Sequence, residues 1–220
     1  AGDPLNRVHW RATARTGTLH SKVYEPSTVS GATIVLDFHQ SSFATQHEPY
    51  RSELAVTATA SIANALYLMG QQVGLITNGR DAADRMRREG IATDARSRSQ
   101  VRKSVQWNEQ SDRLQPILLP TNRGPESATH ILQALARLER TDGLTFPQLI
   151  QETTSRLPRD ATVIAILTHV SAEHTITLDM LRRQGYSVVA ILNIYDEYEY
   201  SQAAGPLLAV GIETRYLRNE

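Results

Sequence analysis

The side chains best placed to do chemistry are the polar ones that directly follow short apolar runs. Asp37 comes after the run Ala32–Leu36, and His39 and Ser41 follow it two and four positions later. These three side chains lie on one side of the chain wherever it stays extended. A carboxylate with a hydroxyl suits a hard cation such as Mg²⁺ or Mn²⁺. Alternatively, Asp37 accepts backbone hydrogen bonds in the following loop and holds no metal.

A second polar group follows the apolar run 162–167, where His169 comes just after Thr168. Two imidazoles with a carboxylate suit zinc, manganese or iron better than magnesium. Asp37, His39 and His169 therefore form a candidate site for a divalent metal ion. The alternative is that both histidines are hydrogen-bonded rim residues. Other apolar runs are also followed by polar residues, namely Thr77, Asn78 and the segment 193–196.

Known catalytic patterns are absent from the sequence, and we expect no enzymatic activity. The chain of 220 residues has no cysteine, which excludes a disulfide, a thiolate zinc site and a cysteine nucleophile. It has no glycine-rich phosphate loop, no Gly-x-Ser-x-Gly elbow and no His-Glu-x-x-His. Ser41, His169 and Asp37 could be combined into a triad, but a chain with seven histidines offers many such combinations.

The formal net charge is zero, with 23 basic and 23 acidic residues, so the whole chain does not attract polyanions. Eight of the basic residues nevertheless gather in the stretch 80–103, among four acidic ones. We expect this stretch to be a solvated face or a docking surface for an acidic partner, with contacts from Arg96, Arg98 and Arg102. Weak nucleic-acid binding through the same arginines is the alternative.

A second candidate contact surface is the segment 195–200, which is acidic and rich in tyrosine. Tyrosine is favoured at protein interfaces, so we expect Tyr195 and Tyr198 to contact a partner.

The sequence predicts no membrane contact for this chain. No apolar run approaches the 18 residues that a membrane helix needs. The polar start, Ala1–Pro4, carries no signal-peptide pattern and looks like a cut inside a longer protein. We expect a cytoplasmic location, as the cytoplasmic part of a membrane-anchored parent protein.

Apolar periodicity predicts the elements that position these side chains. Strands are expected at 19–24, 32–36, 73–77, 117–119, 162–167, 188–192 and 212–217. Helices are expected at 51–69, 82–88, 126–139, from a capping box at Thr145 to before Pro158, at 171–184 and at 202–210. Strands and helices that alternate at this spacing predict right-handed parallel crossovers. The fold class is therefore α/β, with an open, mainly parallel sheet covered by helices on both faces.

The segment Val8–Leu19, with the sequence VHWRATARTGTL, resembles a bacterial family catalogued as domain of unknown function 58. The strand that leads into Asp37 and the run LTFPQLI at 144–150 are similar to the same family. The family is related to von Willebrand factor A domains, so the resemblance implies a von Willebrand factor A-like fold. It implies a signature arm and edge strand at 1–30, within the same domain as the A-like part at 31–220.

The resemblance also implies a metal-ion-dependent adhesion site, which begins Asp-x-Ser-x-Ser in A domains. Asp37 and Ser41 match the first and third positions of that motif, and His39 replaces the first serine. The threonine loop is expected near 123–127, where no threonine stands, and His169 replaces the later aspartate. Because a carboxylate is lost, we expect a degenerate site that does not hold magnesium in the ordinary way.

The resemblance further implies association with a MoxR-type AAA+ ATPase in the assembly or maturation of other complexes. We therefore expect a non-enzymatic protein-interaction module. Two alternatives remain: a metal-binding domain that uses Asp37, His39 and His169, and a weak nucleic-acid-binding surface at 80–103.

Overall fold

The structure, a computed structural model, describes residues 10–18, 31–83 and 114–218. The expected edge strand at 19–24, most of the expected helix at 82–88 and the arginines of the basic stretch beyond Arg80 lie outside these ranges.

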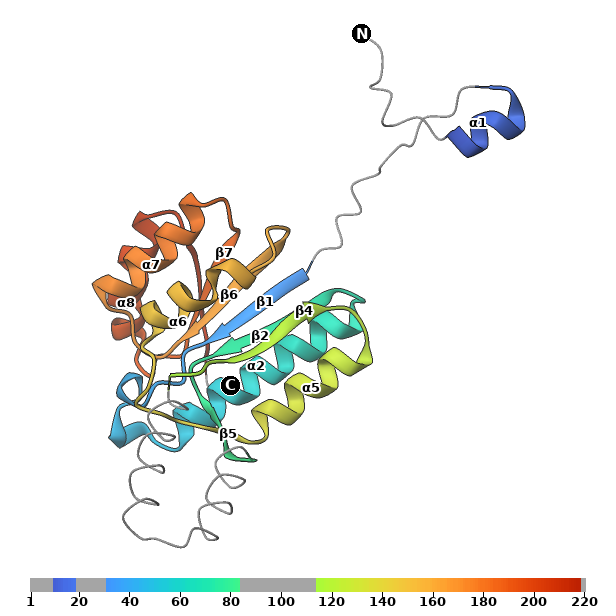
Figure 1. Cartoon of the computed structure of the whole chain (residues 1–220). Helices are drawn as coiled ribbons and strands as arrows, with labels where there is room; N and C mark the ends of the chain where they lie inside the picture. The colour runs from blue at the N-terminus through green and yellow to red at the C-terminus, as the bar shows by residue number, and fades with distance from the viewer. Residues whose placement is uncertain (1–9, 19–30, 84–113, 219–220) are drawn as a thin grey trace, which may run out of the picture.

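A six-stranded sheet forms the centre of the molecule (Figure 1). Its strands lie in the order β4-β2-β1-β6-β7-β8, and neighbouring strands are parallel except β4, which runs antiparallel to β2. The strands are β1 (Gly31–Leu36), β2 (Gln72–Thr77), β4 (Ile117–Asn122), β6 (Ala161–Leu167), β7 (Val188–Leu192) and β8 (Glu213–Tyr216). A separate antiparallel pair joins β3 (Arg80–Asp81) to β5 (Leu138–Glu139).

Helices cover both faces of the sheet, and a hydrophobic core lies on each side (Figure 1). On one face, α2 (Tyr50–Leu68) and α5 (Pro125–Leu135) pack against Ile34 and Leu75. On the other face, α6 (Phe146–Thr153), α7 (Ala172–Arg183) and α8 (Glu197–Ala209) pack against Val35 and its neighbours. All six residues of β1 are buried, as expected of a strand covered on both faces. The predicted architecture, an α/β fold with a mainly parallel sheet and helices on both faces, is confirmed.

The remaining helical segments are short. They are α1 (Trp10–Thr16) within the N-terminal signature, and the 3-10 turns η2 (Gln40–Ser42), η3 (Thr45–His47) and η5 (Thr154–Arg156). None of the helices in the described ranges is long and apolar enough to cross a membrane.

Local signals in the sequence explain several element boundaries. The predicted capping box at Thr145 begins α6, with the Gln148 side chain accepting from the Thr145 backbone N–H at 3.0 Å. Gly70 ends α2 with φ of 69°, a conformation that glycine adopts without strain.

Three expected elements need correction. The helix expected at 126–139 ends at Leu135, because Leu138 and Glu139 pair with β3 instead. The helix expected at 202–210 begins already at Glu197, because the Asp196 side chain caps it by accepting from two backbone N–H groups. The strand expected at 117–119 continues to Asn122.

Candidate functional site

The candidate site lies at the edge of the sheet where the parallel strands end. Leu36 at the end of β1 is in register with Thr77 of β2 and with Ile166 of β6, so the residues after these strands come together. After β1 the chain continues through α2 to β2, which is the neighbour of β1 on one side. The neighbour of β1 on its other side is β6. Ligands of open α/β sheets bind at such a change of direction. We call this edge the carboxyl edge.

Asp37 is the centre of a buried hydrogen-bond network at the carboxyl edge. The residue is 1 % exposed, and one carboxylate oxygen accepts from Ser42 Oγ at 2.6 Å. The other oxygen accepts from Asn78 Nδ2 at 2.8 Å and from the His39 backbone N–H at 3.2 Å. The Nε2 atom of His174 faces the carboxylate at 3.8 Å. Burial alone would raise the pKa of Asp37, but these groups outweigh it and hold the pKa below its ordinary value.

His174 is a site residue that the sequence analysis did not identify. It lies in the first turn of α7, where its Nδ1 accepts from the Ser171 backbone N–H at 3.3 Å and lies 2.7 Å from Ser171 Oγ. The other ring nitrogen, Nε2, is the one that faces Asp37. The ring also stacks on Phe146 with centroids 5.2 Å apart. The spacing Ser171-x-x-His174 could have identified His174 from the sequence, because it is the spacing of a capping box with histidine in place of the usual Glu or Gln.

The structure separates the predicted residues Asp37, His39 and Ser41. The chain does not stay extended after Asp37 but forms the turn η2, so Ser42 reaches the carboxylate instead of Ser41. The His39 ring turns onto its own loop, where Nδ1 lies 2.7 Å from Ser41 Oγ and accepts from the Ser41 backbone N–H. Only the backbone of His39 reaches Asp37.

His169, the other histidine of the predicted metal site, lies against His174. Their ring centroids are 5.9 Å apart and the planes are nearly perpendicular. Before it, Thr168 Oγ1 donates to the backbone carbonyl of Ser42 at 2.7 Å, which ties the end of β6 to the loop after β1. Ser41 bonds to His39, so the combination of Ser41, His169 and Asp37 does not form a catalytic triad.

The prediction that the threonine loop lies near 123–127 is wrong. Because β4 runs antiparallel, its last residue Asn122 pairs with Val73 near the start of β2, at the opposite edge of the sheet. Thr141 lies at the carboxyl edge instead, where it is buried and bridges to His39. Its backbone carbonyl accepts from the Gln40 N–H at 2.9 Å.

These residues do not fit an ordinary magnesium adhesion site. Both oxygens of Asp37 already accept hydrogen bonds from protein donors. Within residues 10–18, 31–83 and 114–218, no group of three or more His, Asp or Glu side chains could hold one metal ion. A hard divalent ion needs several free oxygen ligands, which this arrangement does not offer.

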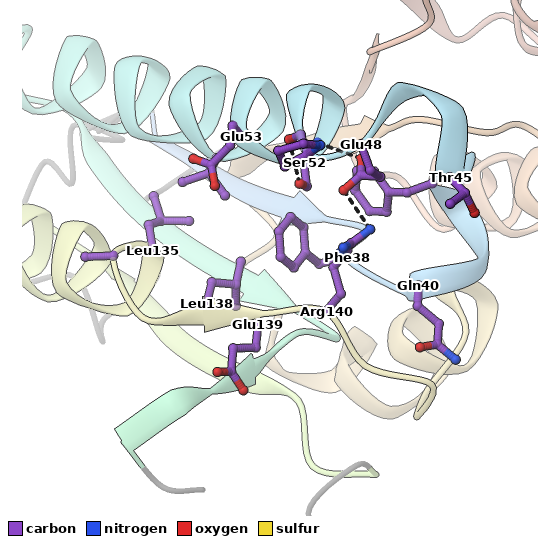
Figure 2. A pocket seen from close by; sticks show the side chains of 14 residues that line it. Phe38, Gln40, Thr45, Glu48, Ser52, Glu53, Leu135, Leu138, Glu139 and Arg140 are labelled. Carbon is purple, nitrogen blue, oxygen red and sulfur yellow. Dashed lines mark hydrogen bonds and ion pairs between the residues drawn. The ribbon is translucent and has the colours of Figure 1, made fainter. Parts of the chain in front are cut away.

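Two cavities lie on either side of the loop that follows Asp37. The larger, of about 860 Å³, lies between this loop, the start of α2 and β5 (Figure 2). Phe38, Leu135 and Leu138 form its apolar wall. Glu48 and Arg140 form an ion pair there, with 2.6 Å between Oε2 and Nη1. No spacing in the sequence indicated this cavity, because its walls come from segments that are distant along the chain.

The smaller cavity, of about 280 Å³, lies between the same loop and the ends of β6 and β7. Arg51 and Asn193 are among its lining residues, and we call it the Arg51 pocket. The Arg51 residue is 4 % exposed, and its Nη1 donates to Asn193 Oδ1 at 2.7 Å. Asn193 Nδ2 in return donates to the Arg51 backbone carbonyl at 2.8 Å. Burial lowers the pKa of Arg51, but a guanidinium stays charged in proteins.

Of the predicted interface tyrosines, Tyr195 lines the Arg51 pocket, and Tyr198 lines an adjoining cavity that shares His169 and Glu199 with it. Tyr195 is 58 % exposed and Tyr198 is 72 % exposed. The Tyr195 ring stacks on His47 with centroids 4.9 Å apart and lies 5.1 Å from the Arg51 guanidinium. The other predicted contact residues, Arg96, Arg98 and Arg102, lie outside the described ranges.

The family described as "Protein of unknown function DUF58" matches residues 1–142 of the chain. No curated protein matches the chain.

Several solved structures are similar to this chain. The pilus adhesin SpaC from Lactobacillus rhamnosus GG, in its open conformation, has a TM-score of 0.53 and 10 % identity. The match covers 91 % of this chain and 29 % of the adhesin, and it shows a shared fold alone. The SpRpn10 VWA domain has a TM-score of 0.46 and 10 % identity, with 87 % and 89 % of the two chains covered. Proximal thread matrix protein 1 from the mussel byssus has a TM-score of 0.44 and 12 % identity, with 82 % and 47 % covered.

Proposed function

This chain belongs to the family described as protein of unknown function DUF58, and on that premise we propose that it is a non-enzymatic protein-interaction module. Its docking surface is the carboxyl edge of the sheet. The observation that carries the proposal is the pair of exposed tyrosines, Tyr195 and Tyr198, beside a pocket at the change of strand direction. Tyrosine and arginine dominate the binding energy of many protein interfaces.

The proposed partner is a MoxR-type AAA+ ATPase, with which the module assists the assembly or maturation of other complexes. The family resemblance supports this partner. An ATP-driven partner also fits the expected cytoplasmic location, as part of a membrane-anchored parent. In this function the degenerate adhesion site is structural, because the Asp37 network braces the loop that carries Ser41 and Ser42.

Binding of the full chain to a purified MoxR-type ATPase, measured by biolayer interferometry with ATP, tests this proposal. Tyr198→Ser together with Tyr195→Ser is expected to weaken binding at least tenfold, which corresponds to about 1.4 kcal/mol. The matched control is Leu68→Ser, because Leu68 is 74 % exposed but lies at the other end of α2, away from the carboxyl edge. The control is expected to bind like the wild type.

Two outcomes would overturn the proposal. If the wild-type chain does not bind the ATPase, the partner is wrong. If the tyrosine variant and the Leu68 variant bind equally well, the docking surface lies elsewhere on the molecule.

A further inference from the structure

The larger cavity, of about 860 Å³, combines an apolar wall with an unengaged carboxylate (Figure 2). We propose that it binds a short segment of the partner protein that carries an arginine beside an apolar residue. This inference rests on the proposed interaction function and adds to it the chemistry of the contact. The cavity adjoins the proposed docking surface, because its lining and that of the Arg51 pocket share Phe43 in the loop after β1.

One side of the cavity is apolar and already ordered. Phe38 and Leu135 belong to the hydrophobic core, and Leu138 is partly buried and packs against it. The Phe38 ring also stands edge-on to Phe43, with centroids 5.4 Å apart. Binding of an apolar side chain here would order few further protein groups, so little conformational entropy would be lost.

The cation that lines the cavity, Arg140, is already paired. Its Nη1 lies 2.6 Å from Oε2 of Glu48, while Oε1 of Glu48 accepts from the Ser52 backbone N–H at 3.1 Å. This ion pair joins the loop after β1 to the segment after β5. Its two charges largely cancel, so the pair adds little repulsion toward a second cation.

The carboxylate that a ligand can reach is that of Glu53. It is exposed in the first turn of α2, across the cavity from Leu135 and Leu138 (Figure 2). Among the residues that the structure describes, no hydrogen bond or ion pair engages this carboxylate. Glu139 adds another carboxylate to the lining. An arginine side chain suits such a site, because its apolar stem can lie on the leucines while its guanidinium meets a carboxylate.

The size of the cavity points to a segment rather than to one side chain. Its volume of about 860 Å³ lies within the range of about 300–1,000 Å³ that is usual for small-molecule sites. Two neighbouring side chains and the backbone that joins them are comparable in size to such ligands. The apolar side chain would fill the wall side, and the arginine would reach Glu53.

Nuclear magnetic resonance titration of the ¹⁵N-labelled chain tests the cavity without the partner. The probes are acetyl-leucyl-arginine methylamide and its neutral match, acetyl-leucyl-citrulline methylamide, in which a urea replaces the guanidinium. We expect the arginine probe to shift the backbone amides of Phe43, Glu53 and Leu138 at concentrations of about 1–10 mM, as a ligand with few contacts allows. The citrulline probe should bind about threefold more weakly, because it lacks the charge.

A change of charge at Glu53 tests the ion pair. Glu53→Gln is expected to weaken the arginine probe about threefold, which is the effect of one exposed ion pair, and to leave the citrulline probe unchanged. The matched control is Glu126→Gln. Glu126 lies in the first turn of α5, at the other end of that helix from Leu135, and should not affect either probe.

A change of volume at Ala136 tests the cavity itself. Ala136 is exposed at the end of α5 and belongs to the lining, so Ala136→Phe fills space without removing a polar side chain. We expect both probes to bind at least tenfold more weakly. The matched control is Ala209→Phe, because Ala209 is an exposed alanine at the end of α8 and lies outside the lining.

Four results would overturn the inference: no shift at these amides, equal affinity for both probes, equal effects of Glu53→Gln and Glu126→Gln, or tighter binding of butylguanidine than of the arginine probe. The last result would make the cavity a site for a small free cation. Failure of the cavity and failure of the proposed function are distinguishable. If the ATPase binds wild type and Ala136→Phe equally, the cavity inference fails and the function stands. If the arginine probe binds but the ATPase does not, the partner is wrong and the cavity stands.

Discussion

At the scale of single residues, Asp37 shows how protein donors stabilise a buried carboxylate. The residue is 1 % exposed, and its carboxylate would be costly to bury alone. Donors from two segments compensate for the lost water: the His39 backbone and Ser42 in the loop after β1, and Asn78 after β2. The Nε2 atom of His174 faces the same carboxylate at 3.8 Å. The ionised form is therefore the stable form in the folded protein.

Replacement of this carboxylate by an amide tests the network. Asp37→Asn is expected to lower the free energy of unfolding by about 2–3 kcal/mol at pH 7, because an amide nitrogen would face donors that need an acceptor. Urea denaturation measures the loss. The matched control is Asp160→Asn, because Asp160 is exposed in a turn before β6. A change at this surface position should stay within about 0.5 kcal/mol.

The stability difference between the wild type and Asp37→Asn should depend on pH. The folded pKa of Asp37 lies below its ordinary value of 3.8, so the stability that its ionised form contributes is present above that value. It is lost as the pH falls through the lower folded pKa. The difference in stability between wild type and Asp37→Asn should therefore shrink below pH 3.8. A difference that grows toward acid would contradict the assigned direction of the pKa shift.

At the scale of elements, the antiparallel strand β4 decides which loops reach the candidate site. Its register against β2 shifts between Val73 and Leu75, around Gly74. The backbone of Thr121 passes so close there that a Cβ on residue 74 would lie 2.8 Å from the Thr121 Cα. Thr121 Oγ1 also shares a hydrogen bond of 2.7 Å with Thr33 Oγ1. Glycine at position 74 is thus a packing requirement of this edge.

Gly74→Ala is expected to lower the free energy of unfolding by about 3 kcal/mol, because the added methyl group forces β4 away from β2. Thr121→Ala alone should cost about 1–2 kcal/mol, through loss of the hydroxyl partner of the buried Thr33. Thermal and urea denaturation measure both. The double variant should not recover the Gly74→Ala loss, since the Thr121 backbone atoms remain in place. Full recovery of stability in the double variant would mean that only the Thr121 hydroxyl, and not the Thr121 backbone, clashes with the added methyl group.

At the scale of the whole molecule, the two helical layers leave the carboxyl edge as the polar end of the sheet. The loop after β1 connects to the end of β6 through Thr168, and to residue 141 through Gln40. These contacts between protein groups hold the edge together. The integrity of the fold should therefore not depend on a divalent ion.

Metal addition and removal test this independence. A ligand at 100 times its Kd would add about 2.7 kcal/mol, which in a domain of this size raises Tm by about 5–10 °C. We expect Mg²⁺, Zn²⁺ and EDTA to leave Tm unchanged, and calorimetric titration with either ion to give no binding heat. His169→Asp restores a carboxylate at the family position, and we expect no gain because Asp37 remains engaged. A rise in Tm of the wild-type chain with either ion would restore Asp37, His39 and His169 as a metal site.

The sequence by itself determined the local features. Runs of apolar residues identified β1, β2, β6 and β7, because burial on both faces leaves a pattern within a few residues. The capping box at Thr145 and the glycine stop at Gly70 were predicted for the same reason. Asp37 was identified as the leading candidate because a carboxylate directly after a buried strand must find partners.

Only the tertiary structure decided what those partners are. Arg51 and Asn193 are 142 positions apart in the chain, and no local pattern links them. Because β4 is antiparallel, residues 123–127 follow it at the opposite edge of the sheet. Thr141, in a later segment, lies beside His39. The α7 capping box aimed His174 at Asp37 only because β6 lies next to β1. Strand order and direction follow from long-range pairing, so the residues that share an edge cannot be derived from spacing along the chain.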